Sequence, residues 1–365
     1  MNELRDNRLK ILLIISVLIM GGLIFILSAG SMQAISLGRQ ELYFFQKQMV
    51  SIVVGCFAMY TAYKVPLNTW RKNVPLLYFL TLILLIAVFF YRPINGAHRW
   101  ILLPGFSFQP SELAKFTLVL YLAHYLEKKE DKLKDFSKGF LPASILLGLI
   151  GALILSEPDF GTTFLMIAIL LAMFLIGGAS IKHIGGMLGF ISPILIAGMM
   201  MGYRKARLLS FLDPWESQYS TGYQLIQSLA AVGSGKILGK GIGNSSQKLH
   251  FLPEAHTDFI YAIIAEETGI VGALFFIAMF AILFYVCVQV AKMHTDKFKR
   301  IFTFGLAYCI IVQTCLHIGV VTGALPTKGI GLPFVSYGGS SMIVSLFMVG
   351  VLIRSAEEAQ GEQDG

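Results

Sequence analysis

Charged residues are scarce in this sequence. Asp, Glu, Lys and Arg together make up 14% of its 365 residues, against about a quarter in an average soluble domain. Hydrophobic residues make up 56% and recur in runs of about 20, which is the length that a helix needs to cross the hydrocarbon core of a bilayer. The composition therefore excludes an ordinary soluble domain and predicts an all-α polytopic membrane protein.

Cysteine is scarce as well. The four cysteines all fall inside apolar runs, at Cys56, Cys287, Cys309 and Cys315. Their spacing matches no metal-binding pattern, so it indicates neither a disulfide framework nor a zinc site. The net charge of +8 is explained better by orientation in a membrane than by nucleic-acid binding, because the basic residues gather in alternate loops.

The apolar runs predict ten membrane spans in a single membrane domain, residues 1–365. We expect the spans at about 10–30, 43–63, 74–91, 111–126, 139–156, 159–177, 183–202, 268–291, 301–322 and 339–354. No small-residue cleavage site follows the first run, so we expect a retained helix and not a signal peptide. Between the seventh and eighth spans lies a large polar loop, residues 203–257.

Most of the 29 Lys and Arg residues fall in the loops of one side of this arrangement. Short cytoplasmic loops of membrane proteins carry an excess of basic residues, whereas long loops cross the membrane largely regardless of charge. The sequence therefore predicts that both termini are cytoplasmic. It places the 203–257 loop on the extracytoplasmic side, between helices 7 and 8.

The long loop ends in the sequence PEAHTDF, residues 253–259, where the first candidate for chemistry is Asp258. One explanation is structural: Thr257 or Asp258 caps the following helix, whose free N–H groups favour an oxygen acceptor. The other is a general base at the mouth of the bundle, with a pKa that low dielectric would raise or a cap would lower. Nearby, Glu266 and Glu267 are expected at the outer interface, where they either pair with loop cations or act on a substrate.

A second group lies in NGAHRW, residues 95–100, and QPSELAK, residues 109–115. Glu112 and Lys115 are three residues apart on one helix face, which favours a local ion pair with Lys115 extended toward water. Alternatively, Arg99 and Lys115 form an anion site, since both are expected within reach of the interface and could hold a diphosphate there.

Two further outer segments carry polar groups. In SEPDFGTT, residues 156–163, Asp159 is explained by helix capping, and the alternative is that Glu157 and Asp159 bind a divalent cation such as Mg²⁺. In LPTKGIGLPFVSYGGSS, residues 325–341, prolines and glycines exclude a regular helix, and Lys328 is the only charge. The GGSS at its end, with Ser340, either presents backbone N–H groups to an anion or allows tight helix packing.

These motifs occur together and in an order that resembles the SEDS family of bacterial cell-wall proteins (shape, elongation, division and sporulation). The resemblance covers nearly the whole chain: ten spans, NGAHRW, QPSELAK, EPDFGT, FLDPW, GYQ, PEAHTDF and SYGGSS. The motifs GNSSQK, PEAHTD and LPTKG are similar to those of the division and sporulation branches of the family. Two departures are Lys236 in GSGK and the segment LPFVSYGG, which is closer to the elongation branch.

The resemblance implies a peptidoglycan glycosyltransferase that polymerises lipid II outside the bacterial cytoplasmic membrane during cell division. The resemblance implies that Asp258 is the catalytic base, which takes the proton of the acceptor sugar's 4-hydroxyl in an inverting transfer. Undecaprenyl diphosphate leaves, with Arg99 and Lys115 near its phosphates. The further candidates for binding sugar or diphosphate are Glu112, His256, Lys328 and Ser340.

The implied partners are a class B penicillin-binding protein, which is a transpeptidase, and other divisome proteins, in contact with membrane lipid and without nucleic acid. Two other functions stay open from the residues alone. One is a flippase that carries lipid II across the bilayer, and the other is a scaffold that only recruits the transpeptidase. The charges expected on the outer side favour surface chemistry over transport, because alternating access uses charged groups at mid-membrane. A requirement for a divalent cation is left undecided.

Overall fold

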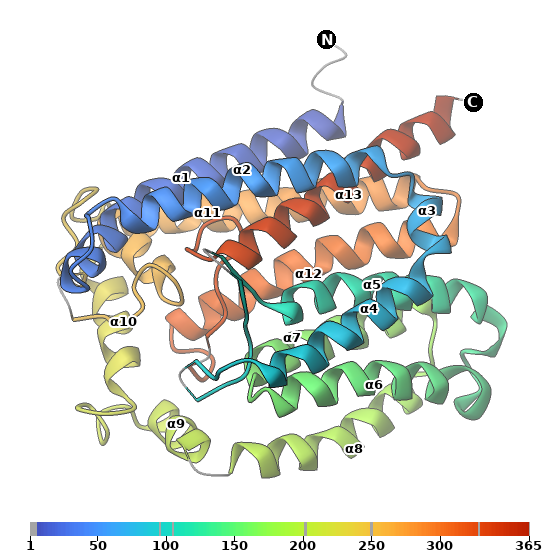
Figure 1. The fold of residues 1–365 in the computed structure, drawn as a ribbon, viewed down its shortest axis with the longest axis horizontal. Coiled ribbons are helices and arrows are strands. Elements are labelled where there is room, and N and C mark those ends of the chain that lie inside the picture. Colours follow the sequence, from blue (N-terminus) through green and yellow to red (C-terminus); the bar gives the residue numbers. More distant parts are fainter. Residues whose placement is uncertain are drawn as a thin grey trace.

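The computed structural model describes residues 6–94, 96–103, 106–200, 203–248, 251–327 and 329–364. Long helices dominate these residues (Figure 1). They are α1 (Asn7–Ser36), α2 (Tyr43–Lys64), α4 (Val74–Ala87), α5 (Pro110–Lys128), α6 (Leu141–Ser156), α7 (Phe160–Gly177), α8 (Ile181–Met199), α11 (Ile260–Met293), α12 (Lys297–Val321) and α13 (Gly339–Asp364). Each expected span coincides with one of these helices, and the expected all-α polytopic class is confirmed.

Shorter elements connect the long helices. They are α3 (Leu67–Lys72), α9 (Tyr203–Leu212), α10 (Tyr223–Ser234), the 3-10 turns η2 (Val88–Phe90) and η3 (Glu130–Lys132), and the π-helical turn η4 (Phe136–Phe140). A small antiparallel hairpin, which the sequence did not lead us to expect, joins β1 (Ile101–Leu103) to β2 (Phe106–Phe108).

Seven helices of the described residues are long and apolar enough to cross a membrane, and the apolar helix of Val74–Phe90 is shorter. The helices α2 and α5 fall outside this group. In α5, charged and polar side chains are buried inside the bundle, including Ser111, Glu112 and Lys115. The total of ten spans and the side on which the long loop lies therefore remain predictions.

The centre of the bundle is formed by α5, α12 and α13, whose buried residues face one another, whereas α8 has no buried residue and lies at the edge (Figure 1). α13 packs along α2, and small residues allow this approach: a Cβ added to Gly350 would lie 2.2 Å from the carbonyl oxygen of Met59. Both chain ends lie at the same end of the bundle (Figure 1), where Arg8 contacts Glu357 at 3.4 Å.

α11 is broken at Gly269, whose φ of 68° and ψ of −167° are not helical. The break frees backbone groups that would be costly to leave unpaired in a membrane protein. The segment 236–241 crosses the break and pairs with them: the N–H groups of Lys240 and Gly241 donate to the carbonyls of Glu266 and Glu267, and the N–H of Ile270 donates to the carbonyl of Lys236. The long loop is thereby attached directly to α11.

Candidate active site

Asp258 lies in the turn just before α11 and is partly exposed. α11 begins at Ile260, and no side chain caps it, so the capping explanation for Thr257 and Asp258 does not hold. The residues 329–338 hold this turn in place. Ser336 donates through its hydroxyl to the carbonyl of Thr257 at 2.6 Å, and the N–H of Tyr337 donates to the carbonyl of His256 at 3.0 Å.

Burial, and then the neighbouring Glu254 carboxylate, raise the pKa of Asp258 to about 7. The guanidinium groups of Arg207 and Arg99 lower this pKa, and the Asp159 carboxylate raises it by a smaller amount. A carboxyl group in this range can both lose and accept a proton near neutral pH, which a general base requires. Asp258 is thus surrounded by four charged groups from four separate segments.

Arg99 comes from the segment between η2 and β1. Its guanidinium donates to two backbone carbonyls, of Glu157 at 3.3 Å and of Pro158 at 2.5 Å. Because these are neutral acceptors, Arg99 keeps its full charge while it holds the turn between α6 and α7. The structure therefore brings this turn and Arg99 into the surroundings of Asp258.

Lys115 does not extend toward water as the ion-pair interpretation expected. Its side chain is buried, with the residue 1% exposed, and its ammonium group lies 2.8 Å from Glu112 and donates to the side-chain oxygen of Gln313 at 2.7 Å. Gln313 in turn donates to the carbonyl of Gly331 at 3.0 Å. α5 turns this face inward, toward α12, because an ion pair that also hydrogen-bonds can be buried. The ion pair itself is present.

Glu157 and Asp159 differ in their surroundings. Asp159 caps α7: one carboxylate oxygen accepts from the N–H of Thr162 and the other from its hydroxyl, at 3.1 and 2.9 Å. Glu157 is fully buried, and burial, with the charge of Asp159, raises its pKa to about 8. A protonated Glu157 beside an Asp159 whose two oxygens already accept hydrogen bonds does not fit a Mg²⁺ site.

Two other candidates have mainly internal partners. The imidazole of His256 packs against the rings of Phe44 and Tyr337, with centroids 4.3 and 5.5 Å away, and burial lowers its pKa. The hydroxyl of Ser340 accepts from the N–H of Gln109 and donates to the carbonyl of Ser107. Both residues therefore position the segments around Asp258.

The remaining candidate, Lys328, lies outside the described residues. The N–H of Gly338, at the start of the GGSS sequence, already donates to the side chain of Gln48, so it is not available to an anion. Glu266 and Glu267 pair with the loop cations Lys240, at 2.6 Å, and Lys248, at 3.3 Å. The structure thus favours pairing over substrate binding for these two glutamates.

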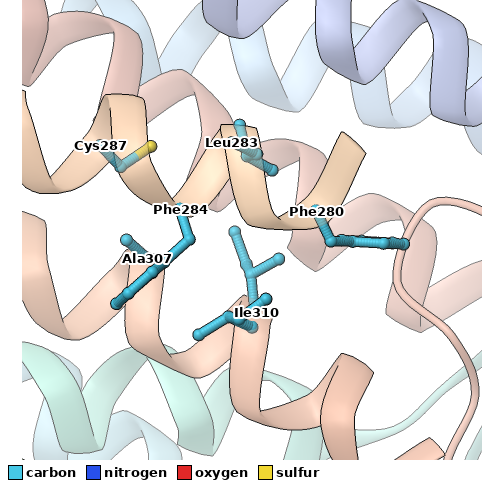
Figure 2. Close-up of a pocket in the computed structure, with 7 residues that line it drawn as sticks. Phe280, Leu283, Phe284, Cys287, Ala307 and Ile310 are labelled. Carbon is cyan, nitrogen blue, oxygen red and sulfur yellow. The ribbon is translucent and has the colours of Figure 1, made fainter. Parts of the chain in front are cut away.

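A small apolar pocket, here called the depression, lies between α11 and α12 (Figure 2). It is lined by Phe280, Leu283, Phe284, Cys287, Ala307, Ile310 and Ile311. These side chains carry no charge and no strong hydrogen-bonding group, so the depression offers nothing to a diphosphate. The polar groups around Asp258 remain the candidate site.

The family model described as a cell cycle protein, FtsW/RodA/SpoVE, matches residues 8–361. The chain belongs to this family. The resemblance to SEDS proteins is therefore confirmed, and with its apolar helices the chain is a multi-pass protein of the bacterial inner membrane.

Individual members of the FtsW/RodA/SpoVE family match the chain over nearly its full length. A probable peptidoglycan glycosyltransferase FtsW of Geobacter metallireducens is 41% identical over 99% of this chain and 97% of that protein. A protein of the same name from Coxiella burnetii is 35% identical over 93% of each.

Two solved structures share the fold. One belongs to a peptidoglycan synthase complex, studied for the coordination of polymerization and crosslinking, with a TM-score of 0.80 at 24% identity over 96% of this chain and 97% of that one. The other is the rod shape determining protein RodA of Thermus thermophilus, with a TM-score of 0.71 at 22% identity over 95% of this chain and 96% of that one. At these identities the likeness concerns the fold.

Three residues around the site were not singled out from the sequence. Glu254 stands in the PEAHTDF motif itself, so its charge four residues before Asp258 was a usable signal. Gln313 lies in α12 among apolar residues, where a buried amide is a weaker signal. No sequence signal pointed to Arg207, because its approach to Asp258 depends on how α9 returns to the bundle.

Proposed function

We propose that this chain is a peptidoglycan glycosyltransferase that polymerises lipid II at the outer face of the cytoplasmic membrane during cell division. Membership of the family and relatives that carry this activity in their names support the reaction class. The observation that carries the mechanism is the raised pKa, about 7, of Asp258, a partly exposed residue in the turn just before α11.

In the proposed reaction, the 4-hydroxyl oxygen of the acceptor sugar attacks the anomeric carbon of the donor from the face opposite the diphosphate. The new glycosidic bond forms as the bond to the diphosphate oxygen breaks, which inverts the carbon. Asp258, ionised beforehand, receives the proton of the hydroxyl. The leaving group is already activated, so one base, positioned substrates and stabilisation of the diphosphate charge suffice.

Arg99 is the principal cation that we assign to the diphosphate, since its contacts are with neutral carbonyls and no carboxylate of the described residues pairs with it directly. Lys115 contributes less, because Glu112 at 2.8 Å already neutralises most of its field. A guanidinium group also matches phosphate oxygens in pairs, which an ammonium group does not.

The proposal also includes the orientation of the chain in the membrane and its protein partners. The chain acts as one membrane domain, with both termini in the cytoplasm and residues 203–257 outside, because the basic loops share the end of the bundle at which both termini lie. Its proposed partners are a class B penicillin-binding protein and other divisome proteins. The structural match to a chain of a peptidoglycan synthase complex supports the first of these.

Polymerisation of labelled lipid II by the purified protein in detergent tests the proposal, because detergent removes any sidedness. We expect Asp258→Asn to lower the rate by at least about 100-fold, the usual contribution of a general base. Asp213→Asn is the matched control, since Asp213 is exposed in the same loop and its oxygen only accepts backbone hydrogen bonds.

Full activity of Asp258→Asn would remove that carboxylate from the mechanism. A wild-type protein that never polymerises lipid II, even with its partner, but moves it between leaflets of liposomes would be a flippase. One that does neither and only binds the transpeptidase would be a scaffold.

A further inference from the structure

A cavity of about 410 Å³ opens far from Asp258. It is lined by Asn68, Arg71 and Lys72 of α3, Pro75 of α4 and His124 of α5. Asp258 precedes the first turn of α11, whereas Arg71 pairs with Asp296, which follows its last turn. The 34 residues of α11 therefore separate the two places, and Figure 1 shows α3 at the end of the bundle where both termini lie. The cavity is independent of the proposed active site.

The lining of this cavity is basic and lacks a carboxylate. Arg71 already has partners, because its guanidinium pairs with Glu127 at 2.6 Å and with Asp296 at 3.2 Å. Lys72 is exposed and makes no ion pair within the described part of the chain. The Nδ1 atom of His124 is buried and has no hydrogen-bond partner there. Because this atom is closed off from the cavity, the uncompensated cation that faces the space is Lys72.

The cavity also lies beside an apolar surface. Pro75 stands in the first turn of α4, and the exposed side chains of α4 begin immediately after it. Leu76, Phe79 and Ile83 are 66%, 62% and 63% exposed, and in a membrane protein such side chains face acyl chains. A ligand with an anionic head and long apolar chains would meet both surfaces, whereas a small soluble anion would use only the cavity.

We propose that this cavity binds the headgroup of an anionic phospholipid. The phosphate lies against Lys72, the polar remainder of the headgroup contacts Asn68, and the acyl chains run along α4. Basic pockets between helices at the membrane surface are suited to such headgroups. This role does not depend on the proposed transferase activity.

Native mass spectrometry of the delipidated full-length protein tests the proposal, with phosphatidylglycerol and phosphatidylcholine as the probes. We expect phosphatidylglycerol to bind at least about tenfold more tightly, and Lys72→Glu to lower its affinity by about tenfold or more. Lys134→Glu is the matched control: it makes the same charge reversal at an exposed lysine outside the cavity, and its affinity should stay within about twofold of wild type.

Asn68→Trp provides an independent variant, because it fills the cavity without changing any charge and should also weaken phosphatidylglycerol binding. Equal binding of the two lipids would overturn the proposal, as would equal effects of Lys72→Glu and Lys134→Glu. Unchanged binding in Asn68→Trp would also overturn it, because the basic residues would then attract the lipid without a headgroup in the cavity. Displacement of the lipid by glycerol 3-phosphate at similar concentration would identify a soluble phosphate ligand instead.

Discussion

Asp258 and Glu157 are both carboxyl groups beside Arg99, and burial raises the pKa of each. Their exposure separates their roles. Asp258 is partly exposed and so able to meet a substrate, whereas Glu157 is sealed in the turn that Arg99 holds. The sequence motifs identified both residues, but neither pKa was deducible from them, because each depends on neighbours that only the fold supplies.

The charges around Asp258 predict opposite shifts in the pH dependence of polymerisation. Glu254→Gln removes a negative neighbour, so the pKa of Asp258 should fall and the rise in kcat/KM with pH should move lower by about half a unit. Arg207→Gln removes a positive neighbour and should move the rise higher by a similar amount. Rate profiles between pH 5 and 9 measure both. Shifts of the same sign in the two variants would contradict this electrostatic description.

Glu157→Gln tests whether this carboxyl group acts as a neutral, structural residue. With a pKa of about 8 it is mostly protonated at pH 7, and glutamine has a similar shape, so the polymerisation rate at pH 7 should stay within about threefold of wild type. The raised pKa means that the native state loses stability as pH rises from about 4.5 toward 8. The variant should therefore gain thermal stability relative to wild type at pH 9 but not at pH 5.

Glu216→Gln, at an exposed glutamate, is the control for this comparison and should show no such pH dependence. A strong loss of activity in Glu157→Gln that added Mg²⁺ reverses would instead assign Glu157 to a metal.

Among the elements, the helices follow from the sequence far better than the hairpin or the orientation of helix faces. Runs of apolar residues determine where the ten long helices can form, because backbone groups in a membrane must pair within the segment. Two three-residue strands leave no comparable pattern. The inward face of α5 was missed because a Glu–Lys pair three residues apart looks the same whether it faces water or Gln313.

The break in α11 is the element-scale feature on which the position of the long loop depends. Gly269 has a positive φ, and a Cβ there would lie 2.3 Å from the carbonyl oxygen of Ile237. Gly269→Ala should therefore lower the thermal unfolding midpoint and the polymerisation rate, by at least about 2 kcal/mol in stability. Gly148→Ala is the control, because Gly148 is helical and has open space around its Cβ position. Equal midpoints for the two variants would contradict the assigned strain.

At the scale of the whole molecule, the two ends of the bundle have different polar chemistry. One end gathers Asp258, Arg99 and the buried pair of Glu112 with Lys115, while the other holds both termini and the contact between Arg8 and Glu357. Basic loop residues predicted this polarity from the sequence, because charge asymmetry is a property of composition. The approach of Arg207 to Asp258 was not predictable, since it joins segments that only folding brings together.

The pH dependence of lipid II polymerisation by the purified wild-type protein tests the central claim most directly, namely that Asp258 is the base. The account predicts that kcat/KM rises with a midpoint near pH 7 and that this rise is absent from the residual activity of Asp258→Asn. A rate that stays level from pH 5 to 9, or a rise that persists unchanged in Asp258→Asn, would contradict it.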